Sequence, residues 1–134
     1  MSAIIREWHP EAVRAMVMKQ LSGNAEAVGI FVEQDARRRL NAIARPDNRR
    51  AVNYRRFLAR WGLTHVVRVL ANGVEVRVGM RTRPVGMKKE PKRADKYHGF
   101  YIEVGSRTAP AQPYLRPAVF QNAREIMRLL AGRV

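Results

Sequence analysis

Apolar residues in the first third of the chain follow a helical spacing. Residues 10–21 are predicted to form a helix, since Pro10 suits a first helical turn and Glu11 lies at the positive end of the helix dipole. Ser22-Gly23-Asn24 interrupts the pattern, and Asn24 is a residue type that caps a second helix; the alternative is one kinked helix through both segments. The second segment has an apolar stripe at three- and four-residue spacing: Ala25, Val28, Val32, Ala36, Leu40 and Ile43.

A third, shorter helix is predicted from about residue 49 to residue 61. Arg45-Pro46-Asp47-Asn48 ends the preceding helix, because proline lacks the backbone donor that a helix needs. Gly62 suits the C-terminal end of the third helix. The apolar side of this helix consists of Tyr54, Phe57, Leu58 and Trp61.

Alternating apolar residues on both sides of Asn72-Gly73 predict a β-hairpin, because Asn-Gly is the favoured pair for a two-residue turn. One face of this hairpin is nearly all apolar and should contact the helices; its pairs are Ala71–Val74, Val69–Val76, Val67–Val78 and His65–Met80. The pairs of the opposite face are Leu70–Glu75, Arg68–Arg77 and Thr64–Arg81. Two directly opposed arginines repel each other, so either both extend into water or an anionic partner covers this face.

The rest of the chain alternates between polar and apolar segments. Residues 83–96 are rich in lysine, arginine and proline, which predicts a mobile basic arm. A strand is predicted at residues 100–104, and a linker stiffened by prolines follows it. A C-terminal helix is predicted from about residue 117 to residue 131, with Pro117 in its first turn and Gly132 as its stop.

These elements predict an α+β fold. It would have a small antiparallel sheet of three or four strands, with N-terminal helices and a C-terminal helix packed on one face. At 134 residues the chain is expected to form a single domain. Its predicted parts are a helical region (8–62), the hairpin (64–82), the basic arm (83–96), and the strand, linker and C-terminal helix (97–134).

The chain is strongly basic, with 26 Lys and Arg against 11 Asp and Glu and a net charge of +15. This balance predicts an anionic partner, either nucleic acid or an acidic protein surface. No cysteine is present, which excludes disulfides and thiolate metal sites. No apolar run approaches the roughly 18 residues of a membrane span, and the N-terminus lacks the apolar core of a signal peptide, so we expect a soluble protein made in the cytoplasm.

The acidic residues and histidines form no recognised catalytic or metal-binding pattern. A nuclease-like cluster can be drawn from three residues: Asp95, His98 and Glu103. Glu103 is better explained as a carboxylate that accepts N–H bonds from the Gly105-Ser106 turn or pairs with Arg116. His65, on the apolar face of the hairpin, is expected to pack with one nitrogen satisfied. We therefore expect no enzymatic activity and no cofactor.

The last third of the chain has an unusual order of residues, in which an aromatic-rich stretch with a glycine turn precedes a proline-rich linker and a helix. The residues that carry this pattern are Tyr101, Glu103, Gly105, Ser106, Pro113, Tyr114, Leu115, Arg116, Pro117 and Ala118. From Tyr97 to the C-terminus the chain resembles the neck, or tail-completion, proteins of long-tailed bacteriophages, which lie at the head–tail junction. Such proteins often carry a Pro…Thr-Gly turn after the N-terminal helix, where this chain has Pro46-Asp47-Asn48-Arg49-Arg50.

The resemblance implies a structural virion protein that is made in the host cytoplasm and assembles as a ring, expected to have six subunits. The ring would join a head-closure or connector protein to a tail terminator or tail tube protein. The resemblance implies that inter-subunit or docking contacts involve Tyr101, Glu103, Gly105, Pro113, Tyr114, Leu115, Arg116 and Pro117. The residues expected to face packaged DNA in the lumen or an acidic neighbour are Arg68, Arg77, Arg81, Lys88, Lys89, Lys92, Arg93 and Lys96.

The alternative prediction is a basic protein that binds nucleic acid without sequence preference. Aromatic residues make up only 7% of the chain, so a stacking platform for single strands is not expected. No helix-turn-helix or RNA-recognition signature is visible either. Binding would therefore depend on phosphate contacts and would weaken steeply with salt.

Overall fold

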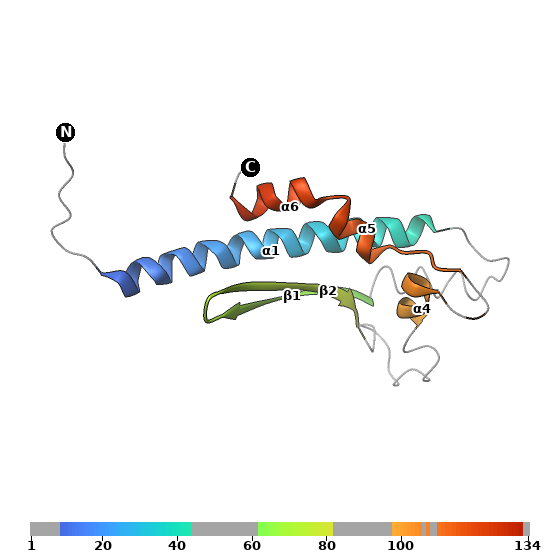
Figure 1. Cartoon of the computed structure of the whole chain (residues 1–134), viewed down its shortest axis with the longest axis horizontal. Coiled ribbons are helices and arrows are strands. Elements are labelled where there is room, and N and C mark those ends of the chain that lie inside the picture. The colour runs from blue at the N-terminus through green and yellow to red at the C-terminus, as the bar shows by residue number, and fades with distance from the viewer. Residues whose placement is uncertain (1–8, 44–61, 82–97, 106, 108–109, 133–134) are drawn as a thin grey trace.

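The computed structural model of the chain describes residues 9–43, 62–81, 98–105, 107 and 110–132 (Figure 1). Its helices and strands are α1 (Pro10–Ala42), β1 (Leu63–Leu70), β2 (Gly73–Met80), α4 (His98–Val104), α5 (Leu115–Phe120) and α6 (Ala123–Leu130). The predicted third helix at 49–61 and the predicted basic arm at 83–96 lie outside the described residues. Among the helices that are described, none is both long enough and apolar enough to cross a membrane.

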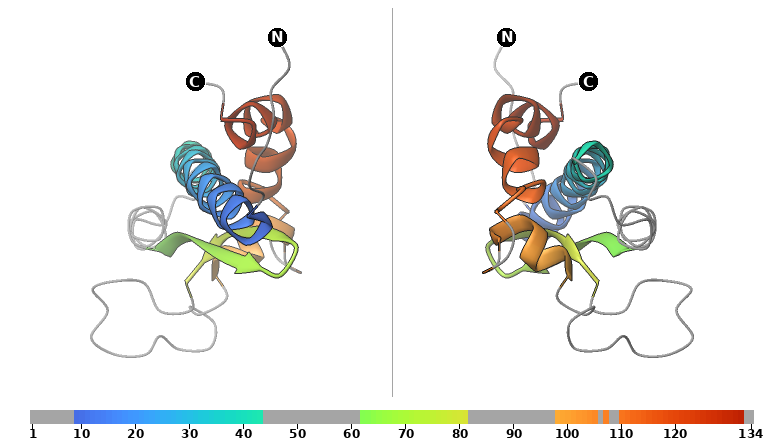
Figure 2. Two further views of the ribbon diagram at one scale, coloured as in Figure 1. Left: turned by 90° about the vertical axis from the view of Figure 1, so that its left-hand side faces the viewer. Right: turned by 90° about the vertical axis from the view of Figure 1, so that its right-hand side faces the viewer.

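Helix α1 is the central element of the structure. The β1–β2 hairpin lies along one side of α1, and α5 and α6 lie along another side (Figure 1, Figure 2). The predicted α+β class is confirmed, and α1 and the C-terminal helices lie on the same side of the hairpin. The sheet predicted to have three or four strands has two in the described part of the chain, because the segment expected to supply a third strand is helical. The buried core lies where α1 meets these neighbours and consists of Val28, Val32, Ala36, Leu40, Leu63, Ile102, Tyr114 and Ala118.

Helix α1 runs without interruption through Ser22-Gly23-Asn24, so the predicted break is wrong and the single-helix alternative describes the segment. The apolar stripe predicted for its C-terminal part is confirmed, since five of the six residues are buried and Ile43 packs against the core. Packing of this stripe against two neighbours outweighs the cost of a glycine inside a helix, about 1 kcal/mol. Asn24 does not cap a helix start. Its Nδ2 instead donates to the carbonyl oxygen of Leu130, at the end of α6, over 3.0 Å.

Strands β1 and β2 form the predicted antiparallel hairpin, but their register differs from the prediction by two residues. The turn consists of Ala71-Asn72, and Gly73 pairs with Leu70 as the first residue of β2. None of these turn residues has a positive φ, so the turn is not the left-handed type that favours Asn-Gly. Because a shift of two residues leaves each side chain on its predicted face, the apolar face still contacts α1.

The observed register changes which charges meet on the outer face of the hairpin. Arg68 lies opposite Glu75, with its Nη1 3.8 Å from Oε2. The Nε of Arg77 donates to the other oxygen of the same glutamate over 2.9 Å. The predicted Arg68–Arg77 pair is therefore wrong, because Arg77 lies opposite Val66. One carboxylate partly neutralises both arginines.

The segment predicted to be a strand at residues 100–104 is helix α4, so this prediction is wrong. The periodicity of a short apolar run does not distinguish a strand from a helix. The helix ends before Gly105, whose φ of 84° is the left-handed conformation common at helix ends. Both Ile102 and Glu103 are buried, the first in the core and the second against the start of α5. The linker follows this helix closely, since the N–H of Gln112 donates to the carbonyl oxygen of Ile102 over 2.8 Å.

The C-terminal helix is divided into α5 and α6 at Gln121-Asn122, so the prediction of one continuous helix is wrong. The break is stabilised by the side chain of Asn122, whose Nδ2 donates to the carbonyl oxygen of Ala118 over 2.9 Å. Two other predictions are confirmed. Pro117 lies in the first turn of α5, and Gly132 follows α6 with a φ of 70°.

Two glycines of α1 provide a paired test of how closely the hairpin packs on it. A Cβ at Gly29 would lie 2.6 Å from Cδ2 of His65, whereas a Cβ at Gly23 would have nothing within 4 Å. We expect Gly23→Ala to raise the free energy of unfolding by about 0.5–1 kcal/mol, the usual gain when alanine replaces glycine in a helix. Gly29→Ala should lower it by about 1–3 kcal/mol, because the imidazole ring has to move. Urea unfolding measures both, and equal stabilisation by the two changes would contradict this packing.

Candidate functional site

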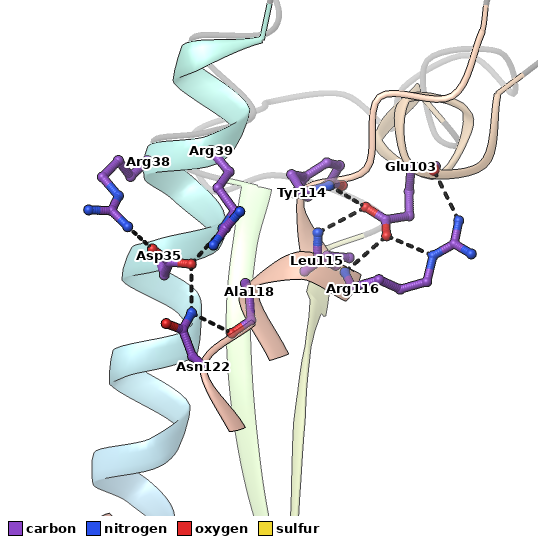
Figure 3. Close-up of polar contacts among 9 residues, drawn as sticks. All are labelled: Asp35, Arg38, Arg39, Glu103, Tyr114, Leu115, Arg116, Ala118 and Asn122. Carbon is purple, nitrogen blue, oxygen red and sulfur yellow. Dashed lines mark hydrogen bonds and ion pairs between the residues drawn. The ribbon is translucent and has the colours of Figure 1, made fainter. Parts of the chain in front are cut away.

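The carboxylate of Glu103 joins α4 to the start of α5 (Figure 3). Its Oε2 accepts the backbone N–H of Tyr114 over 2.7 Å and that of Leu115 over 2.9 Å. Its Oε1 accepts the backbone N–H of Arg116 over 3.0 Å and the Nε of the same residue over 3.1 Å. Burial alone raises the pKa of Glu103, but the N–H bonds outweigh it and hold the pKa below its usual range.

The first turn of α5 explains why a carboxylate lies here. The first N–H groups of a helix have no partner within the helix, and α5 has no side-chain cap of its own. Glu103 accepts three of these donors, and the next residue, Pro117, has no N–H to satisfy. The predicted ion pair with Arg116 is confirmed. The described backbone donors, however, belong to residues 114–116 and not to the predicted Gly105-Ser106 turn.

Some of the residues that carried the sequence resemblance are part of the core. Tyr114 and Ala118 are both 0% exposed, and Leu115 packs against the core. Burial, together with the nearby charge of Glu103, raises the pKa of Tyr114. Because Glu103 and Tyr114 are buried within the subunit, they affect a docking surface only through the fold that they stabilise.

A second polar cluster joins α1 to the break between α5 and α6 (Figure 3). The Oδ2 of buried Asp35 accepts the Nε of Arg39 over 2.6 Å and the Nδ2 of Asn122 over 2.9 Å, and its Oδ1 pairs with Arg38. Burial alone raises the pKa of Asp35, but these bonds bring it below its usual range. The sequence alone does not reveal this cluster, because 87 positions separate Asp35 from Asn122 and no local pattern relates them.

The imidazole of His65 lies between two carboxylates of α1. Its Nε2 is 2.5 Å from an oxygen of Glu26, and its Nδ1 is 2.8 Å from an oxygen of Glu33. The prediction of one satisfied nitrogen is wrong, because both nitrogens are bound. The bond to Glu26 is the main cause of a raised pKa of His65, and with Glu33 it outweighs the opposing effect of burial. No cluster suited to hold a metal ion occurs among the residues that the structure describes.

An apolar groove of about 720 Å³ lies between α1, β2 and the C-terminal helices. Its lining consists of Leu21, Ala25, Val28, Val32, Val74, Val76, Arg77, Val78, Leu115, Arg116, Val119, Phe120, Ile126 and Leu130. The side of the groove formed by α5 is accessible, since Phe120 is 75% exposed and Val119 is 40% exposed. This lining suits the binding of an apolar surface, because it contains no carboxylate, histidine or hydroxyl group.

The remaining predicted site residues have the following positions. Tyr101 lies in α4, Gly105 and Pro117 are half-buried, and Pro113 is exposed. Three predicted anion-facing residues are exposed on the hairpin or directly after it: Arg68, Arg77 and Arg81. The predicted basic residues that lie outside the described residues are Lys88, Lys89, Lys92, Arg93 and Lys96.

No family model matches the chain, and neither a curated protein nor a solved structure matches it.

Replacing the carboxylate of Glu103 tests its role in joining α4 to α5. We expect Glu103→Gln to lower the free energy of unfolding by about 2–4 kcal/mol, because an amide brings its own donors against three backbone N–H groups and removes the charge opposite Arg116. Urea unfolding followed by circular dichroism measures this loss. The matched control is Glu125→Gln, which removes an ion pair with Arg128 on exposed α6 and should leave the midpoint close to that of the wild type. Equal midpoints for the two variants would contradict a special role for Glu103.

The bridge of His65 predicts a pH dependence of stability. Its pKa is raised in the folded state, so its contribution is complete below the ordinary value of 6.5 and is lost as the pH rises through the folded pKa. We therefore expect the urea midpoint of the wild type to fall between pH 6 and pH 9, and the midpoint of His65→Gln to fall less over the same range. Parallel pH profiles for the two proteins would show that the histidinium does not stabilise the fold.

Proposed function

We propose that the protein is a structural component of a tailed-phage virion, which forms a ring at the head–tail junction and joins the head connector to the tail. The observation that carries the proposal is the clamp at Glu103. Four of the ten residues by which the chain resembles neck proteins fasten α4 to the first turn of α5: Glu103, Tyr114, Leu115 and Arg116. A connection of this kind suits a protein whose role is to hold surfaces at a fixed angle.

The buried acids also support a structural role. Asp35 and Glu103 have both carboxylate oxygens engaged by arginines or N–H donors, and the pKa of each lies below its usual range. A general acid or base works best with a pKa near the working pH and a free path to its substrate. Neither carboxylate has these properties, whereas both stabilise contacts between distant segments.

In the proposed ring, expected to have six subunits, one face binds the head-closure protein and the other binds the tail terminator or tail tube protein. The basic residues face DNA in the lumen or an acidic neighbour. The described residues contain 12 Lys and Arg and 7 Asp and Glu, which leaves 14 and 4 for the other segments. Most of the net positive charge therefore belongs to residues outside those that the structure describes, and we assign the anion-facing role mainly to those residues.

Electron microscopy of lysates tests the proposal. A stop codon in this gene of the parent phage should produce filled heads and finished tails that lie separate, because the joint between them is missing. Adding the purified protein to such a lysate should restore joined particles, which serves as the control for an effect on neighbouring genes. Normal infectious particles from the mutant phage would overturn the proposal.

Nucleic-acid binding is the second candidate function, and the excess charge outside the described residues favours it. Titration of the purified protein with duplex DNA at 50 mM and 200 mM salt measures this function. A free DNA-binding protein should bind at the nanomolar level near physiological salt, with an affinity that falls steeply as salt rises. Weak binding, together with separated heads and tails, would support the neck function instead.

A further inference from the structure

The apolar stripe of α1 continues beyond the part that the fold covers. From Leu21 toward the N-terminus the stripe continues at four-residue steps through Val17 and Val13, and Met16 lies beside it. Val13 is 41% exposed, Val17 is 57% exposed and Met16 is 73% exposed. The N-terminal part of α1 extends past the end of α6 and past the turn of the hairpin (Figure 1). We call these three residues the α1 knob.

Within the described residues, the part of α1 that carries the knob is bound to the hairpin turn. The guanidinium of Arg14 donates to the carbonyl oxygen of Ala71 in the hairpin turn over 2.6 Å, which holds the N-terminal part of α1 beside the hairpin. On the side of α1 that faces the C-terminal helices, α6 ends at Leu130, beside Asn24. The three residues of the knob lie beyond this point and are exposed. A regular helical segment with apolar side chains therefore projects from the structure.

The groove between α1, β2 and the C-terminal helices is a concave apolar surface, whereas the knob is convex. Its volume of about 720 Å³ accommodates several side chains, and Phe120 and Val119 are accessible along its α5 side. A chain does not fill its own groove with its own knob. Helix α1 is continuous for 33 residues, about 50 Å, and its middle part, from Leu21 to Val32, already forms one wall of that groove.

The mostly apolar lining of the groove favours an uncharged apolar occupant, such as the α1 knob of a second copy, over an acidic segment. The only two charged residues of its lining are Arg77 and Arg116, which pair with Glu75 and Glu103 respectively. An acidic segment would therefore meet arginines that already contact a carboxylate, although Glu75 is shared between Arg77 and Arg68. The α1 knob consists of three uncharged side chains, and its burial in the groove needs no compensating charge.

We propose that the α1 knob of one copy of this chain binds in the groove of the next copy. Because the knob and the groove are different surfaces of one molecule, repetition of this contact produces a closed ring or an open filament. This contact would join the subunits of the proposed ring. Only the ring shape of the product rests on the proposed function; the contact itself does not. A segment that spans little more than one helical turn buries less area than a standard interface, so we expect association at protein concentrations on the order of 10 µM.

A complementation experiment with two variants tests this contact. Val17→Asp places a charge in the knob, and Phe120→Asp places the same charge in the groove; both sites are more than half exposed, so neither change should impair folding. Sedimentation velocity should show that the wild type forms oligomers and that each variant alone associates about tenfold more weakly or stays monomeric. An equimolar mixture of the variants should form pairs and go no further, because it contains one intact knob and one intact groove per pair.

The matched control is Met127→Asp. Met127 is 64% exposed on α6 and does not line the groove, so this variant should associate like the wild type. The proposal is overturned if the wild type is monomeric well above 10 µM, if either test variant associates like the wild type, if the mixture gives no pairs, or if the control is equally impaired. Circular dichroism of each variant verifies that the fold is retained.

The contact and the phage function fail in different ways. If the wild type forms only closed dimers and the complementation result is as expected, the proposed contact is supported and the larger ring is contradicted. Normal virions from the stop-codon phage would remove the function and leave the contact intact. Separate heads and tails, together with variants that associate like the wild type, would keep the function and overturn the contact.

Discussion

The β1–β2 hairpin and the C-terminal helices α5 and α6 both pack on α1, so this one helix has to fit two neighbours at once. Its apolar stripe provides most of this contact, from Ala25 to Leu40. Polar side chains fix the positions of the neighbours. Asn24 binds the end of α6 at Leu130, and Asp35 binds its start at Asn122. Glu26 and Glu33 bind the imidazole of His65 in β1. Since burial is non-directional, these hydrogen bonds determine where along the helix each neighbour lies.

Local patterns in the sequence predicted those features that depend on local geometry. The stripe of α1 repeats at the helical period, the alternation around residue 72 indicates a hairpin, and Gly132 marks the end of α6. The register of the hairpin is different, because an Asn-Gly pair favours one turn without requiring it. The choice of Ala71-Asn72 keeps the same apolar face against α1, so burial does not distinguish the two registers.

The remaining differences come from contacts between distant positions. Helix α4 has the composition of a strand, but Glu103 reaches the first turn of α5 only because the two segments meet in space. The break after Phe120 depends in the same way on Asp35, which lies 87 positions from Asn122. The candidate groove was also beyond prediction, because three separate parts of the chain line it. The apolar knob residues were visible in the sequence, but nothing local indicated that the fold leaves them uncovered.

The clamp at Glu103 also determines how the C-terminal third of the protein loses its structure. Helices of six and eight residues are too short to persist alone in water, so α5 and α6 exist only through their contacts. The start of α5 depends on α4, the break depends on Asp35, and the end of α6 depends on Asn24. We therefore expect this region to open as one cooperative unit and not to fray residue by residue from its end.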